Sequence, residues 1–163
     1  MHIIINKKYL TYGNYRAKCA IGKRGIGFKR KEGDLITPKG RYKIKYILYR
    51  RDRIIKIRTK IKRIVIKKDM GWCDDPKSKN YNKLVVFPNE YSCEKIYKKE
   101  NTYDIIIVLN YNMNPTIKNK GSAIFIHVAK NNYKKTEGCV AIKKSDLKKL
   151  IEKINKKTIV KIF

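Results

Sequence analysis

Short apolar runs that are rich in β-branched and aromatic residues recur along the whole chain, with turn-forming residues between them. Such runs are typical of strands, and residues 41–46 alternate charged and apolar side chains as a half-buried strand does. The sequence therefore predicts a fold that is mainly β with minor α. The strands expected on this basis are Ile3–Ile5, Tyr15–Ile21, Gly40–Tyr49, Tyr103–Leu109, Ala123–Val128, Cys139–Ile142 and Thr158–Phe163.

Helical spacing of apolar residues is clear in one segment near the C-terminal end. Ser145 is a good N-cap for this helix, and Asp146 would lie in its first turn. We expect an amphipathic helix here, followed by a terminal strand. The residues of its apolar stripe are Leu147, Leu150, Ile151 and Ile154.

Three segments in the middle of the chain have less regular patterns. Arg50–Lys68 alternates basic residues with isoleucine, which predicts two strands joined by a turn near Thr59 and Lys60. Met70–Pro88 has no periodicity and contains several Gly, Pro and Asn residues, so we expect a long irregular loop. Ser92–Glu100 is interpreted as one short helix.

Length and charge limit the possible classes of protein. With 163 residues, the chain is expected to form one domain over residues 1–163. Its 42 Lys and Arg residues against 13 Asp and Glu residues give a net charge of +29. This charge indicates attraction to a polyanion, although an AT-rich genome would also enrich Lys, Ile, Asn and Tyr together. Few aromatic residues interleave with the charges of Arg50–Lys68, so no obligate nucleic-acid partner is expected. A non-catalytic, cationic nucleic-acid-binding protein is a less favoured alternative.

Other common features are missing from the pattern. No stretch approaches the length of a transmembrane helix, and the N-terminal residues make a poor signal peptide. The basic loop Gly22–Gly33 is not followed by a Gly-Lys-Ser/Thr phosphate motif, so turn chemistry explains its glycines better. There is no CxxC and there are only two histidines, so no metal set is expected and no cofactor is required. We expect a monomer.

His127 and Cys139 are the residues that most directly indicate chemistry, with eleven residues between them. A thiol needs a base to become a nucleophile near neutral pH, and an imidazole is the usual base. Gly138 would let a substrate carbonyl approach the backbone, where the N–H groups of Gly138 and Cys139 can hold an oxyanion. The pairing suggests a cysteine acyl-transfer enzyme, but spacing alone is weak evidence, and a buried cysteine beside a satisfied histidine stays the more common alternative for such a pair. If Cys139 is the nucleophile, the pairing among Cys19, Cys73 and Cys93 stays open.

The segments GSAIFIHVAK and TEGCVAI resemble the catalytic segment of the L,D-transpeptidase (YkuD-like) family. Three further segments are similar to its small, mostly proteobacterial branch: EGDLITPKGRYKI, DMGWCDDPKSKNYNKLV and YDIIIVLNYNMNP. Together these matches run from about Gly13 to Leu150. Glu137 and Ala141 depart from the commoner pattern of the family, which has His and Arg at these places.

This resemblance implies an L,D-transpeptidase-like β-sandwich, with Cys139 as the nucleophile and His127 as the base. A backbone carbonyl near Ser122–Ala123 would orient His127, and the surrounding lysines would favour a thiolate. The resemblance also implies peptidoglycan stem peptides as the substrate, the periplasm or cell wall as the location, and acylation of Cys139 by carbapenems. Water as the acceptor would instead give a carboxypeptidase or endopeptidase, and an unrelated cysteine hydrolase is a further alternative. The substrate-binding residues expected on this basis are Trp72, Asp75, Tyr81, Asn82, Tyr111, Thr136 and Glu137.

Overall fold

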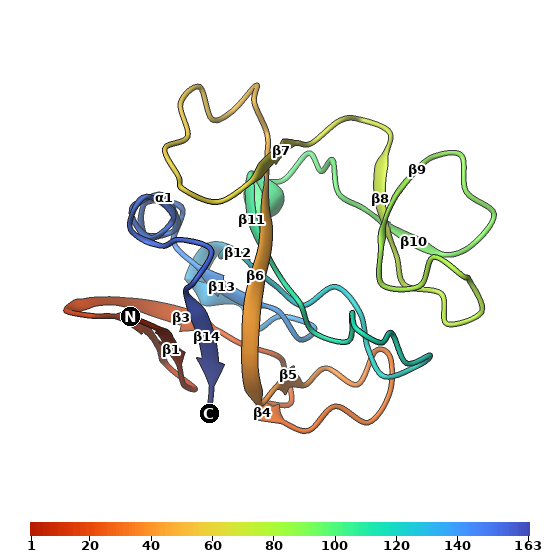
Figure 1. Ribbon diagram of the computed structural model, residues 1–163, viewed down its shortest axis with the longest axis horizontal. Helices are drawn as coiled ribbons and strands as arrows, with labels where there is room; N and C mark the ends of the chain where they lie inside the picture. The colour runs from red at the N-terminus through yellow and green to blue at the C-terminus, as the bar shows by residue number, and fades with distance from the viewer.

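The computed structural model describes the whole chain, residues 1–163. Its elements are short strands, one α-helix and two 3-10 turns, η1 and η2 (Figure 1). The predicted fold, mainly β with a helix and then a strand at the C-terminal end, is confirmed. The strands are β1 (Ile3–Ile5), β2 (Tyr9–Tyr12), β3 (Tyr15–Ala20), β4 (Ile26–Gly27), β5 (Thr37–Pro38), β6 (Gly40–Tyr49), β7 (Arg63–Val65), β8 (Met70–Cys73), β9 (Leu84–Val86), β10 (Cys93–Lys95), β11 (Ile105–Leu109), β12 (Phe125–Val128), β13 (Val140–Ile142) and β14 (Ile159–Ile162). The helices are η1 (Asn101–Tyr103), η2 (Asn131–Tyr133) and α1 (Lys144–Lys153).

The main sheet closes on itself. Its strand order is β11-β12-β13-β3-β2-β1-β14-β6-β7, and β6 also pairs with β11. The long strand β6 pairs with β14 through Gly40–Lys43 and with β11 through Ile44–Tyr49. This double pairing joins the two halves of the sandwich into one ring that leaves no unpaired edge between β11 and β6.

Alternate residues of β11 point into two different apolar clusters, because side chains alternate between the faces of a strand. Ile105 and Ile107 belong to a cluster of 24 buried residues, which also contains the stripe of α1. Ile106 and Val108 belong to a cluster of eight, which is covered by the three-stranded sheet β10-β8-β9. Figure 1 shows α1 and this small sheet on opposite sides of β6 and β11.

The C-terminal helix forms as predicted, except at its start. The four residues of the predicted stripe are buried in the large cluster. The prediction of Ser145 as N-cap is wrong, because the helix begins at Lys144 and its N-cap, Lys143, makes no side-chain cap hydrogen bond. Asp146 lies in the first turn as expected and accepts a hydrogen bond from the Tyr15 hydroxyl at 2.7 Å. No helix of the fold is long and apolar enough to cross a membrane.

The prediction of two strands over Arg50–Lys68 is wrong. Only β7 forms there, in parallel with the end of β6. Ile54, Ile57 and Ile61 are buried in the large cluster from an irregular segment. Their spacing of three to four residues suits packing against a core but does not suit the two-residue period of a strand.

The predictions for the small sheet are also wrong. The expected irregular loop Met70–Pro88 contains β8 and β9, and the expected helix Ser92–Glu100 contains β10. These strands have three or four residues each, too few to show a local period, and their pairing with one another defines them. The sequence pattern likewise did not predict β2, which forms a hairpin with β3.

Candidate active site

The parallel pairing of β12 with β13 determines where His127 and Cys139 lie. Ile126 is opposite Val140, and His127 is opposite Ala141. Cys139 therefore lies level with Phe125, two positions before His127, or about 6.6 Å along the strands at 3.3 Å per residue. Residues two apart on a strand face the same way, and both side chains line one cavity of about 540 Å³. The structure thus brings the predicted nucleophile and base to one site.

His127 is buried, with 6% of its surface exposed. Its Nδ1 lies 3.0 Å from the carbonyl oxygen of Val128, so Nδ1 acts as the donor and Nε2 remains the acceptor. Its ring packs edge-on against Tyr103 at 5.4 Å between centroids. The prediction of an orienting carbonyl near Ser122–Ala123 is wrong, because the backbone of His127's own strand provides it. Burial lowers the pKa of His127 to about 4, so the ring is neutral at pH 7.

The Cys139 thiol is held by two backbone groups of the segment before His127. It donates a hydrogen bond to the Ala123 carbonyl at 3.0 Å and accepts one from the Phe125 amide at 3.4 Å. The residue as a whole is partly exposed, but burial of its sulfur raises the thiol pKa to about 12. Lys29 and Lys98 lower the pKa of this thiol, which is the direction expected of nearby lysines, but burial outweighs them and keeps the thiol protonated at pH 7.

The backbone before the thiol offers one free donor. Gly138 has φ +143°, and a Cβ there would lie 3.0 Å from the carbonyl oxygen of Ile36, so only glycine fits without displacement. The Gly138 amide donates to the Thr136 hydroxyl at 3.2 Å. The Cys139 amide has no acceptor within the protein, so it is available to a substrate oxygen.

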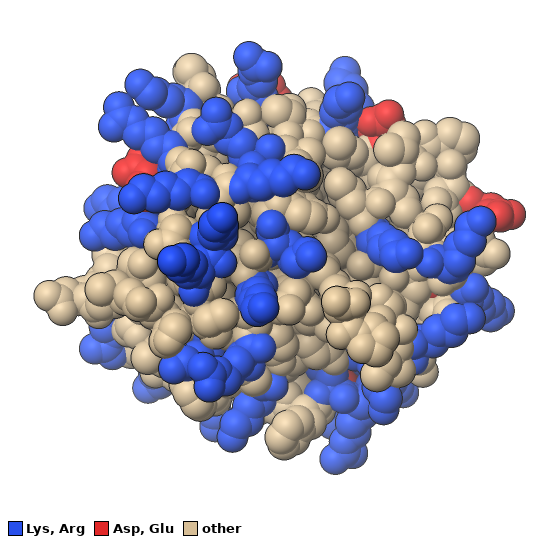
Figure 2. All heavy atoms as spheres, viewed as in Figure 1, with Lys and Arg blue, Asp and Glu red and all other residues tan.

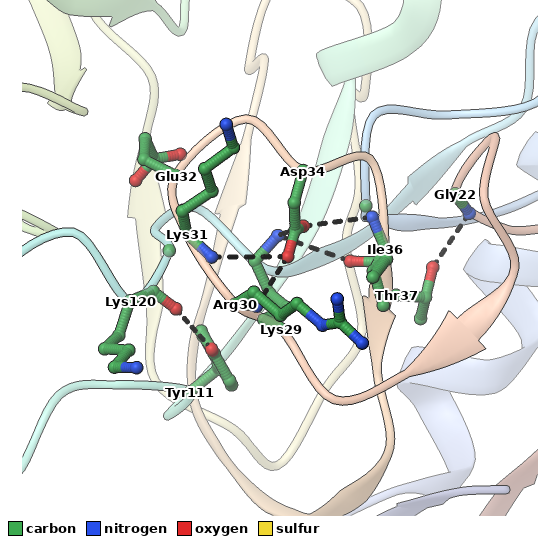
Figure 3. Close-up of polar contacts among 12 residues, drawn as sticks. Gly22, Lys29, Arg30, Lys31, Glu32, Asp34, Ile36, Thr37, Tyr111 and Lys120 are labelled. Atoms are coloured by element: carbon green, nitrogen blue, oxygen red, sulfur yellow. Dashed lines mark hydrogen bonds and ion pairs between the residues drawn. The ribbon is translucent and has the colours of Figure 1, made fainter.

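Two threonines hold the carbonyl group of Cys139. The Thr136 hydroxyl donates to this oxygen at 2.5 Å, and the buried Thr37 hydroxyl approaches it at 3.5 Å. Thr37 in turn accepts a hydrogen bond from the Gly22 amide at 2.8 Å, as Figure 3 shows. The Thr-Pro-x-Gly segment therefore supports the nucleophile from behind, over 100 residues away in the sequence.

A buried ion pair in the Gly22–Thr37 loop is a feature that the sequence pattern did not indicate. Lys29 Nζ lies 2.5 Å from Asp34 Oδ1, and both side chains are only 3% exposed. Asp34 also accepts hydrogen bonds from the amides of Arg30 and Ile36, at 2.7 Å and 3.1 Å (Figure 3). Lys29 lines the cavity, and its Nζ would lie 3.7 Å from a Cβ at Gly138. The pair thus fixes the Lys29 ammonium, balanced by the Asp34 carboxylate, beside Gly138.

Asn82 connects the small sheet to the residues that hold the thiol. Its side-chain oxygen accepts from Trp72 Nε1 at 3.1 Å and from the Ala123 amide at 3.0 Å. Its side-chain nitrogen donates to the carbonyls of Tyr111 and Asn112 at 2.9 Å and 2.8 Å. Of the four residues that Asn82 bonds in this way, only Ala123 lines the cavity. Asn82 therefore positions Ala123, whose carbonyl accepts a hydrogen bond from the Cys139 thiol.

The other predicted binding residues lie at different distances from the site. Thr136 and Glu137 line the cavity, whereas Trp72, Tyr81, Asp75 and Tyr111 do not. Trp72 is 1% exposed and packs edge-on against Phe125 at 5.0 Å. The Tyr81 hydroxyl donates to Glu32 and accepts from the Gly121 amide. Asp75 accepts from the Lys77 amide in a local turn, and the Tyr111 hydroxyl donates to the Lys120 carbonyl (Figure 3).

The cavity carries charges of both signs. Glu94, which sequence reasoning missed, accepts from Lys98 at 2.7 Å and from the Tyr103 hydroxyl at 2.8 Å, beside His127. The basic residues that line the cavity are Lys23, Lys29, Lys98, Lys130, Lys134 and Lys135, and the acidic ones are Glu32, Asp74, Glu94, Glu100 and Glu137. Such a lining suits a ligand that carries both carboxylate and ammonium groups. No group of three or more His, Cys, Asp or Glu side chains is placed to hold a metal ion.

A β-rich fold that brings a thiol, an imidazole and a free backbone amide to one polar cavity is that of a cysteine-dependent enzyme. The family model of the L,D-transpeptidase catalytic domain, YkuD, matches residues 2–162, and the chain belongs to this family. Members of the family are cysteine-dependent enzymes that act on peptidoglycan and are typically associated with the cell wall. A search of curated proteins gives no significant match.

Proposed function

We propose that the protein is a peptidoglycan L,D-transpeptidase, which works through one catalytic domain over residues 1–163 in the periplasm or cell wall. Cys139 forms a thioester with a stem peptide, and the acyl group is then transferred to an amine of another stem. The observation that carries this proposal is the β12–β13 register, which puts His127 and Cys139 in one cavity in a chain of this family.

The chemistry starts from a neutral pair. As Sγ of Cys139 attacks the peptide carbonyl, its proton passes to Nε2 of His127, and the oxyanion is held by the Cys139 amide. Collapse of the tetrahedral intermediate breaks the C–N bond, and the imidazolium gives its proton to the leaving amine. An incoming amine then attacks the thioester, loses a proton to His127, and releases the thiol.

Substrate recognition follows from the mixed charge of the cavity. The lysines of its wall attract carboxylates of the stem peptide. Glu137, whose side chain is 82% exposed and lies 3.9 Å from Lys23 Nζ, is accessible to an ammonium group of the substrate. Thr136 lines the same wall and donates a hydrogen bond to the Cys139 carbonyl. We assign a positioning role outside the cavity to Trp72, Tyr81, Asn82 and Tyr111. Asp75 holds only a local turn, so we assign it no role toward the substrate.

The thioester chemistry is tested by intact-mass analysis of the folded protein after treatment with a carbapenem. We expect one adduct on the wild type, one adduct on Cys19→Ala as a control for a buried thiol, and none on Cys139→Ala. Replacing His127 with Gln should slow acylation about 100-fold or more, because the base is lost. Folded wild-type protein without an adduct would contradict the proposal.

The acceptor is tested with purified muropeptides. A cross-linked dimer that forms with wild type and not with Cys139→Ala supports the transpeptidase. Shortened stems without dimers would instead identify a carboxypeptidase or endopeptidase at the same site.

A further inference from the structure

Cys73 and Cys93 lie directly opposite each other in the small sheet. They are Cα partners in the antiparallel pairing of β8 with β10. The Asp74 amide donates to the Ser92 carbonyl and the Ile96 amide donates to the Met70 carbonyl, so hydrogen-bonded pairs lie on both sides. Because hydrogen-bonded and non-hydrogen-bonded pairs alternate along antiparallel strands, Cys73 and Cys93 form a non-hydrogen-bonded pair, in which the two Cα atoms are about 4.5 Å apart. This separation is within the range of disulfides.

The two thiols are adjacent but differ in their access to solvent. Cys73 is fully buried, while Cys93 is partly exposed and gives an oxidant access. Burial and the neighbouring Cys73 raise the pKa of Cys93 to about 11, which is consistent with two sulfurs in contact. The remaining cysteines are in other places, Cys19 in the large cluster and Cys139 at the cavity.

We propose that Cys73 and Cys93 form a disulfide that fastens β8 to β10. The oxidant is a low-molecular-weight disulfide. The Cys93 thiolate attacks one of its sulfurs and releases one thiol, and Cys73 then displaces the second thiol from the mixed disulfide. Two protein thiols lose two electrons and two protons, and the oxidant gains the same.

The bond would stabilise an element that reaches the active site. β10 carries Glu94, which lines the cavity on the strand face opposite to Cys93 and bonds Tyr103 beside His127. The loop closed by the disulfide would span residues 73–93, and a crosslink of this length restricts the unfolded chain. We expect oxidation to raise the melting temperature by about 5–10 °C.

The test uses the full folded chain with Cys139→Ala, which removes the reactive thiol and makes the result independent of the acyl-transfer chemistry. The protein is incubated with oxidised glutathione and analysed by intact mass and by non-reducing peptide mapping. We expect the loss of two hydrogen masses and one crosslinked peptide pair containing Cys73 and Cys93. Adding Cys19→Ser should leave this pair unchanged.

Three outcomes would overturn the proposal. These are a crosslink that involves Cys19, stable glutathione adducts on Cys93 without a crosslink, or free thiols throughout in the folded protein. Because the mapping is done without replacing Cys73 or Cys93, a folding defect of such variants does not affect the result. Reduction of the crosslinked protein should reverse the shift in melting temperature.

Discussion

Cys139 and His127 are both uncharged at neutral pH in the resting site, since burial acts on each in the direction of its neutral form. The protonated thiol donates a hydrogen bond to the Ala123 carbonyl, and Nδ1 of the imidazole donates one to the Val128 carbonyl. Activation then requires the substrate, whose carbonyl must enter the cavity before proton transfer becomes favourable. This arrangement protects a nucleophile from adventitious oxidation while it waits for substrate.

The pH dependence of Cys139 alkylation follows from these shifts. The reactive form is the thiolate, and with a pKa near 12 its fraction rises about tenfold per pH unit through the whole range from pH 7 to 10. His127, with a pKa of about 4, should add no inflection near 6.5. Iodoacetamide labelling of Cys139, read by mass with Cys139→Ala as the blank, measures this profile. A plateau above pH 7 would indicate a thiolate–imidazolium pair instead.

Replacing Thr37 tests whether its hydroxyl stabilises the backbone around Cys139. Thr37→Val removes the acceptor of the buried Gly22 amide and the contact to the Cys139 carbonyl. We expect a loss of about 1–3 kcal/mol in the free energy of unfolding, together with slower carbapenem acylation. Urea denaturation and acylation kinetics measure the two effects. Thr11→Val, which removes a surface contact at 3.5 Å, should change stability by less than about 0.5 kcal/mol.

At the scale of the elements, the central strands β11 and β12 could be predicted because they are apolar on both faces. The runs at residues 105–109 and 124–128 show this directly, and β11 and β12 form there. The chemistry was indicated by the resemblance of the segments around His127 and Cys139 to the family, because the spacing of the two residues alone is weak evidence. The small sheet could not be predicted, because Met70–Cys73 and Cys93–Lys95 are strands only through each other. For the same reason, nothing in the local pattern pointed to Glu94 as a neighbour of the site, and Asn82 was expected there only from the family resemblance.

The Gly22–Thr37 loop should depend on its ion pair. Lys29→Met leaves Asp34 charged and unpaired in a buried place, and we expect a loss of about 3–5 kcal/mol in the free energy of unfolding. The double variant Lys29→Met, Asp34→Asn removes both charges and should recover part of this loss. Urea denaturation of the single and double variants decides the matter. Equal stability of Lys29→Met and wild type would show that the pair does not support the loop.

At the scale of the whole molecule, charge is the dominant property. Figure 2 shows Lys and Arg side chains spread over the face that it draws, with few acidic side chains among them. Because these charges do not gather in one stripe, they suit attraction to an extended acidic material better than the tracking of a single nucleic-acid strand. The net charge of +29 should therefore concentrate the protein on its acidic substrate without fixing an orientation.

A salt titration distinguishes this electrostatic attraction from the acylation of Cys139. Binding to purified sacculi should fall about tenfold or more between roughly 0.05 and 0.5 M salt, because screening shortens the reach of the charges. Carbapenem acylation of Cys139 should change much less over the same range, since it depends on the cavity. Co-sedimentation and intact mass give the two readouts. Acylation that declines in step with binding would show that salt disturbs the site itself.

The ring of strands has a consequence for how the chain reaches its native state. β14 lies between β1 and β6, pairing in parallel with Ile3–Ile5 and antiparallel with Gly40–Lys43. Until residues 159–162 arrive, both of those neighbours expose open backbone. Contacts this distant in sequence form slowly, so folding should proceed in one late, cooperative step once residues 159–162 have been synthesised. A ribosome-bound intermediate lacking that last strand would thus be the species most in need of a chaperone.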